Sequence, residues 1–75
     1  MKWTAIKCVP SADGNRRMTI LSERGGLFRF EEETLMGEDV YDYWGPTHLS
    51  GLYDCVEAAE RDAYIELPWL RDFSK

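Results

Sequence analysis

Three runs in which polar and apolar residues alternate fill most of the first 33 residues, and they restrict the fold more than any other feature. The runs cover residues 3–9, 17–23 and 27–33, and two short segments, residues 10–15 and 25–26, separate them. Alternation with a period of two is typical of strands with one buried face. Both separating segments contain glycine, which supplies the positive φ of a tight reversal. The pattern predicts an antiparallel three-stranded meander.

The alternation also predicts which side chains share a face. Met18 and Ile20 fall on one face of the second predicted strand, and Phe28 and Phe30 fall on one face of the third. Strict alternation in the first strand places four residues together, namely Trp3, Ala5, Lys7 and Val9. We expect the sheet face with the phenylalanines to be buried.

A fourth strand is predicted between residues 40 and 53, with two alternatives for its course. Residues 34–39 are expected to form a linker, and residues 40–44 to form a strand or an ordered aromatic segment. Gly45-Pro46 should interrupt it, because proline cannot donate a hydrogen bond to a neighbouring strand. Residues 47–53 then complete or replace the fourth strand.

The C-terminal third predicts one amphipathic helix. Asp54 is expected to be its N-cap, with Glu57 three residues later in a capping-box arrangement. Apolar residues follow at helical spacing, namely Val56, Ala59, Ala63 and Leu67. Pro68 should end the helix, because it disfavours helical geometry at the residue before it. Residues 68–70 are expected to fold back as a short apolar cover.

These elements define a single α+β domain over residues 1–75, an antiparallel meander of three to four strands with one C-terminal helix packed on one face. The string from Ser50 to Ala59 resembles the strand-to-helix connection of many small bacterial domains of unknown function that combine a β-meander with a helix. That resemblance implies the same fold.

The composition restricts the class of protein. With 44% hydrophobic residues the chain can bury a core, so it is not expected to be disordered. No apolar run approaches the roughly 18 residues of a membrane span. Residues 1–7 lack the apolar block of an export signal, so we expect a cytoplasmic, reducing environment. Cys8 and Cys55, predicted to be buried or half-buried, are too far apart in sequence for a metal or redox motif.

The net charge of −5 hides an uneven distribution. Residues 1–30 carry a net +4, residues 31–66 a net −10, and residues 67–75 a net +1. One interpretation is a solvated acidic face that the basic N-terminal strands partly neutralise. The other is a surface that attracts a basic partner. The acidic block argues against direct binding of nucleic acid.

No catalytic or ligand motif is found. His48 has no nucleophile motif nearby, so we predict no enzymatic activity. The acids at residues 31–33 and 38–39 lack the spacing of a calcium loop, so we predict no metal or other cofactor.

The aromatic residues are numerous for so small a core, and tyrosine and tryptophan are common where proteins bind partners. Core packing is expected for Trp3 and Trp69. Tyr41, Tyr43 and Trp44 are interleaved with Asp42 beside Gly45-Pro46 and are preferred as contacts. The predicted partner-binding residues are Glu31, Glu33, Glu38, Asp39, Tyr41, Asp42, Tyr43, Trp44, Glu57 and Glu60.

Two functions compete. The first is a non-enzymatic protein-binding domain that uses an acidic, aromatic-studded surface, in its most specific form a nucleic-acid mimic that inhibits a nucleic-acid-binding protein. In size and acidity the chain is similar to small phage-borne inhibitors, including anti-CRISPR proteins. The alternative is a small bacterial structural or interaction module that forms a homo-oligomer, such as a homodimer, or joins a larger assembly. A mimic requires the acids of residues 31–42 and of residues 54–66 to form one continuous surface.

Overall fold

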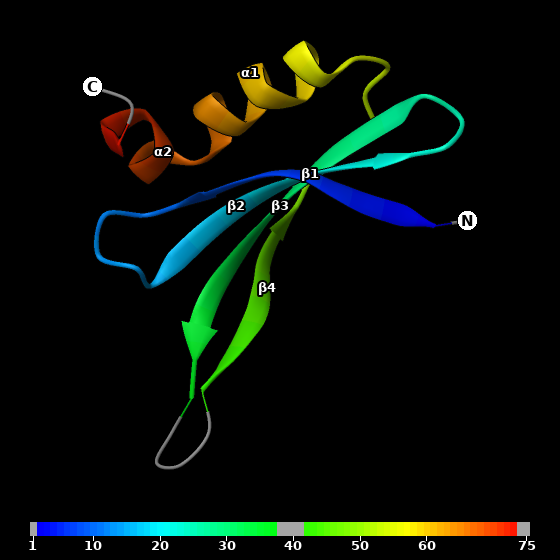
Figure 1. The fold of residues 1–75 in the computed structure, drawn as a ribbon. Coiled ribbons are helices and arrows are strands. Elements are labelled where there is room, and N and C mark those ends of the chain that lie inside the picture. Colours follow the sequence, from blue (N-terminus) through cyan, green and yellow to red (C-terminus); the bar gives the residue numbers. More distant parts are fainter. Residues whose placement is uncertain (1, 38–41, 74–75) are drawn as a thin grey trace.

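The computed structural model describes residues 2–37 and 42–73, and it contains one four-stranded antiparallel sheet with two helices (Figure 1). The strand order β1-β2-β3-β4 follows the sequence. The elements are β1 (Trp3–Pro10), β2 (Arg16–Glu23), β3 (Leu27–Met36), β4 (Tyr43–Leu49), α1 (Val56–Glu66) and α2 (Pro68–Phe73). The predicted α+β meander with a C-terminal helix is confirmed.

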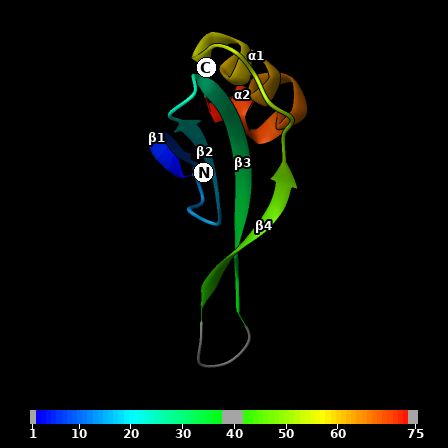
Figure 2. The ribbon, with the colours of Figure 1, turned by 90° about the vertical axis from the view of Figure 1, so that its right-hand side faces the viewer.

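The core lies between the helices and one side of β2 and β3. Its buried residues are Met18, Ile20, Phe30, Ala63, Leu67 and Leu70. Ala59 and Ala63 have no exposed surface, and their small side chains let α1 lie close to the sheet. Figures 1 and 2 show both helices at the same side of the sheet, while the β3–β4 hairpin extends away from them.

The first strand departs from strict alternation. Its pairing with β2 shifts between Ala5 and Lys7, so that Ile6 is an extra residue in a β-bulge. Because a bulge reverses the alternation beyond it, Trp3 and Ala5 face one side of the sheet, and Lys7 and Val9 face the core side. The predictions that these four share a face and that Trp3 packs in the core are therefore wrong.

The third strand is longer than predicted, and the fourth is not interrupted where interruption was predicted. Residues 34–36, assigned to a linker, continue β3, and β4 runs through Gly45-Pro46. The fourth strand ends at Leu49, so residues 50–53 do not belong to it. Pro46 lies on an edge strand beside a shift in the pairing with β3, and edge strands and bulges are the positions at which sheets tolerate proline. The prediction for residues 40 and 41 lies outside the described residues.

The helix begins one residue later than predicted, and its cap is different. Cys55, in an extended conformation, is the N-cap of α1 and makes no side-chain capping bond. The predicted capping box of Asp54 and Glu57 is therefore wrong. The end is as expected, since α1 stops at Glu66 before Pro68. The predicted apolar cover is the short helix α2, whose Leu70 is fully buried.

Candidate functional site

The register of the strands separates the two sides of the sheet. Directly paired residues share a side, so the partners of the buried Met18 and Ile20 lie towards the helices. We call the opposite side the open face, because no described helix covers it. Its residues are Trp3, Ala5, Cys8, Pro10, Arg17, Thr19, Leu21, Glu23, Leu27, Arg29, Glu31, Glu33, Leu35, Trp44, Pro46 and Leu49.

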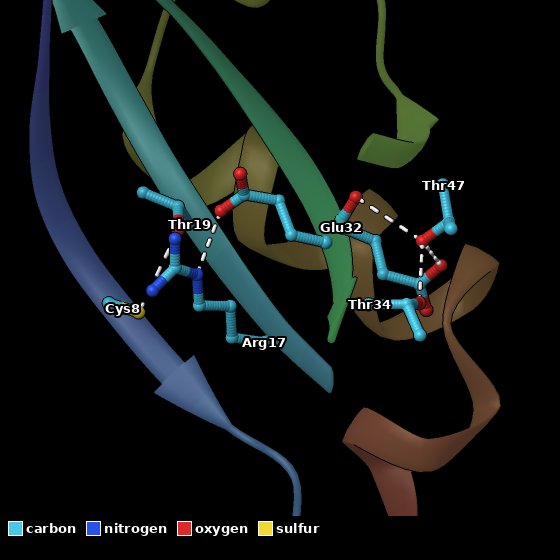
Figure 3. Close-up of polar contacts among 7 residues, drawn as sticks. Cys8, Arg17, Thr19, Glu32, Thr34 and Thr47 are labelled. Carbon is cyan, nitrogen blue, oxygen red and sulfur yellow. Dashed lines mark hydrogen bonds and ion pairs between the residues drawn. The ribbon is translucent and has the colours of Figure 1, made fainter. Parts of the chain in front are cut away.

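One ordered group on the open face joins three strands. Arg17 of β2 is paired directly with Glu33 of β3, and its Nε donates to Glu33 Oε1 over 2.8 Å (Figure 3). The guanidinium carbon of Arg17 lies 4.1 Å from the centroid of the Trp44 ring of β4. A guanidinium over an indole face is a favourable cation–π contact. The two contacts fix Arg17 between a carboxylate and an aromatic ring.

A second group repeats this arrangement towards β1. Arg29 Nη2 lies 2.7 Å from Glu31 Oε2, and its guanidinium carbon is 4.6 Å from the centroid of the Trp3 ring. The Nε atom of Arg29 is buried and has no hydrogen-bond partner within residues 2–37 and 42–73. The open face therefore carries two Trp–Arg–Glu stacks, Trp44–Arg17–Glu33 and Trp3–Arg29–Glu31.

The described acidic residues of the predicted site do not form the unpaired acidic surface that was expected. Glu31 and Glu33 are brought together on one face as expected, but each forms an ion pair with an arginine. Glu57 is exposed on α1, and Glu60 accepts a hydrogen bond from Lys7 Nζ on the helix side, over 3.3 Å. Glu31 and Glu33 of β3 thus lie on the side of the sheet opposite to the acids of α1. The two sets of acids do not form one continuous surface.

The predicted aromatic contacts divide between the two sides of β4. Trp44 is paired with Leu35 on the open face, whereas Tyr43 is paired with Met36 on the other side and is 58% exposed. Asp42 is exposed just before the strand. Glu38, Asp39 and Tyr41 lie outside the described residues.

The predicted site did not include Glu32, a buried carboxylate on the helix side of the sheet. Glu32 is 8% exposed, and its two oxygens accept hydrogen bonds of 2.6 Å each from Trp69 Nε1 and Thr47 Oγ1. The Thr47 hydroxyl also lies 3.0 Å from Thr34 Oγ1, and Figure 3 shows these residues together beside β3. The alternation already placed Glu32 opposite Glu31 and Glu33, and this is the signal for its burial. The network fastens α2 to the sheet.

Both edges of the sheet carry features that hinder pairing with another strand. The edge strand β1 has a bulge at Ile6, a lysine at residue 7 and a proline at its end. The other edge strand, β4, has a bulge and Pro46. Bulges, lysines and prolines are the devices by which proteins protect sheet edges. Association through the open face is therefore better supported than association through an edge.

The histidine, Tyr53 and the two cysteines are further candidate functional groups. The ring of His48 stacks on Phe30, with the centroids 5.4 Å apart. Burial, and then the Asp62 carboxylate, raises the pKa of Tyr53 above its ordinary value. Cys8 and Cys55 are free thiols and are exposed, so the prediction that they are buried or half-buried is wrong. No cluster of three or more potential metal ligands is found in the described part of the chain.

Comparison of the chain with protein-family models, with curated proteins and with solved structures yields no match. Within the described residues, neither helix has the length and apolar character needed to cross a bilayer.

Proposed function

We propose that the protein is a non-enzymatic protein-binding module whose contact surface is the open face of the sheet. The observation that carries this proposal is the pair of Trp–Arg–Glu stacks on a face that no described helix covers. Tryptophan and arginine are the residues most enriched among those that dominate binding energy at interfaces.

The stacks also limit the entropy lost on binding. A free arginine side chain loses rotamer freedom when a partner immobilises it, at a cost of about 0.5–1.5 kcal/mol. Arg17 and Arg29 are already held by a carboxylate and an indole ring before any partner arrives. A surface ordered in advance favours specific docking.

Charge indicates the kind of partner. The net charge of −5 and the exposed acids of α1 attract a basic protein over a distance, whereas the contact surface contains paired charges and aromatic rings. We therefore propose a partner with a basic surface around an apolar patch, in the cytoplasm, where exposed free thiols remain reduced. Nucleic-acid mimicry is the less supported form, because the described acids do not share one surface.

A photo-crosslinking experiment tests the proposal with a matched pair of positions. Leu49 on the open face is 60% exposed, and Ile65 on the outer side of α1 is 59% exposed. Each is replaced in turn by p-benzoyl-phenylalanine in the full chain, and adducts are identified by mass spectrometry after irradiation in cells of the source organism. We expect one abundant protein adduct from the Leu49 position and little from the Ile65 position.

Competition with protein that carries no crosslinker is the control for chance contacts. An excess of unlabelled protein should abolish the adduct, while an excess of the Trp44→Ser variant should not. Equal adducts from both positions, or none from Leu49, would contradict the open face as the contact surface. An adduct between two copies of the chain would support the alternative, a homo-oligomeric module.

A further inference from the structure

An open cavity of about 670 Å³ lies beside the turn between β1 and β2, and the proposed function does not use it. Of its lining residues, Leu35 also belongs to the open face. The turn between β1 and β2 forms one wall, and Thr34, Leu35 and Trp69 form the other. Volumes of about 300–1,000 Å³ are typical of sites for small molecules. The lining residues indicate the class of ligand that fits this cavity.

The aromatic wall is held in a fixed orientation. Trp69 Nε1 donates to the buried Glu32 carboxylate over 2.6 Å, and the indole is half-buried against the core. Thr34 is fixed by its contact with Thr47. Trp69 lines the cavity in this fixed position, and a planar aromatic ring is a ligand group that suits an indole wall.

The polar wall contains a cation, Arg16, whose guanidinium forms no direct ion pair within the described residues. Arg16 is paired with Thr34 on the helix side of the sheet, and its side chain is exposed and forms no ion pair within the described ranges. The nearby Asp13 carboxylate is already engaged, because its Oδ1 accepts from Ser11 Oγ over 2.6 Å and from the Asn15 N–H over 3.0 Å. The hydrogen bonds from Ser11 and Asn15, and then the charge of Arg16, lower the pKa of Asp13, so the guanidinium lies near this carboxylate without forming an ion pair with it. A ligand carboxylate would therefore have to compete with Asp13 for Arg16.

We propose that this cavity binds a small planar aromatic carboxylate, with its ring against Trp69 and its carboxylate against Arg16. The fork of an arginine side chain matches a carboxylate in two parallel hydrogen bonds. The Asp13 carboxylate on the same wall and the net charge of −5 oppose a ligand with two or more negative charges. A monoanion is therefore favoured over a phosphate ester.

The probe is 2-naphthoate, titrated into ¹⁵N-labelled full-length protein and followed by amide and indole N–H shifts. Ligands of this size reach dissociation constants on the order of 1 mM with ordinary contacts. We expect saturable shifts at the Trp69 indole, at Arg16 and at Thr34, and small shifts at the indoles of Trp3 and Trp44.

Two analogues, one without the charge and one without the planar ring, separate the contributions of Arg16 and Trp69 to binding. The amide 2-naphthamide retains the ring and loses the charge, and cyclohexanecarboxylate retains the charge and loses the planar ring. Each is expected to bind at least about fivefold more weakly than 2-naphthoate, since each lacks one of the two contacts. Equal binding of the naphthamide would overturn the role of Arg16.

Variants complete the test. Arg16→Gln should weaken 2-naphthoate about tenfold or more, whereas Arg24→Gln, which removes an exposed arginine from the β2–β3 turn, should not change it. Amide spectra confirm that both variants are folded. Unchanged affinity of Arg16→Gln, or shifts that do not saturate, would refute the site. Neither result bears on crosslinking from Leu49, so the two proposals fail separately.

Discussion

Replacement of Glu32 by alanine should destabilise the protein more than any other single loss of charge. The carboxylate is 8% exposed and accepts two hydrogen bonds of 2.6 Å, one from Trp69 and one from Thr47. A hydrogen bond to a charged group contributes about 1.5–3 kcal/mol. The Thr47 hydroxyl keeps its contact with Thr34 in the variant, so breaking its bond to Glu32 should cost less than the full value. We expect Glu32→Ala to lower the free energy of unfolding by about 3 kcal/mol.

That loss is large for a chain of this size. Stabilities of about 0.05–0.15 kcal/mol per residue give roughly 4–11 kcal/mol for the whole domain. Urea denaturation followed by far-ultraviolet circular dichroism measures the change in the free energy of unfolding. The matched control is Glu31→Ala, which removes a neighbouring glutamate from the open face and breaks its half-buried ion pair with Arg29. Exposed ion pairs contribute about 0–1 kcal/mol, and we expect this half-buried pair to lie near the upper end of that range, well below the cost of Glu32→Ala.

A double-mutant cycle isolates the contact between sheet and helix. Trp69→Phe keeps an aromatic ring and removes the N–H donor, and we expect it to cost about 2 kcal/mol. Because both single variants break the same bond, their effects should overlap by about 1.5 kcal/mol in the double variant. Strict additivity, or a Glu32→Ala cost no larger than that of Glu31→Ala, would refute the view that Glu32 fastens α2 to the sheet.

Three further predictions follow from single residues. The raised pKa of Tyr53 means that its neutral form is favoured in the folded state, so its contribution to stability is present below pH 10.0 and is lost as pH rises through the folded pKa. Absorbance at 295 nm should show one late-titrating tyrosine, and Tyr53→Phe should remove it. Gly26→Ala should cost about 1 kcal/mol in urea denaturation because φ is +87° there, while Gly51→Ala, also with open space around it, should be nearly neutral. Ala63→Leu should cost about 1–3 kcal/mol or more by overpacking the contact between α1 and the sheet, whereas the same change at the half-buried Ala58 should cost less.

The main features of the sheet were predictable because they depend on local pattern. Alternation placed Met18 and Ile20 on one face of β2 and both phenylalanines on one face of β3, and the observed pairing keeps these residues on the same side. The predicted turn at Gly25-Gly26 does not by itself give the register, which is centred on Gly25 and places Arg17 opposite Glu33. The buried alanines of α1 follow from helical spacing. The stack on Trp44 does not follow, because it requires the register of a fourth strand that the sequence left open between two alternatives.

The features that were missed depend on contacts between distant segments. The bulge at Ile6 lets Lys7 reach Glu60 on α1, a contact between residues 53 positions apart, and the strand alone gives no sign of it. Likewise, Asp54 and Glu57 match a capping box, but the chain enters α1 from the bridge between Tyr53 and Phe28 and reaches the helix through an extended Cys55. Tertiary contacts there override the local preference.

The distribution of the acids leads to a kinetic prediction that rests on the proposed function. The segment with a net charge of −10 contributes paired carboxylates on the open face, one buried carboxylate and a charged outer helix. Unpaired acids therefore act over distance, while the contact surface is nearly neutral. Raising salt should slow association with the basic partner, because screening weakens attraction, and should leave dissociation almost unchanged. Surface plasmon resonance between 50 and 500 mM salt separates the two rates, and a dissociation rate that rises as steeply as the association rate falls would place the acids in the contact itself.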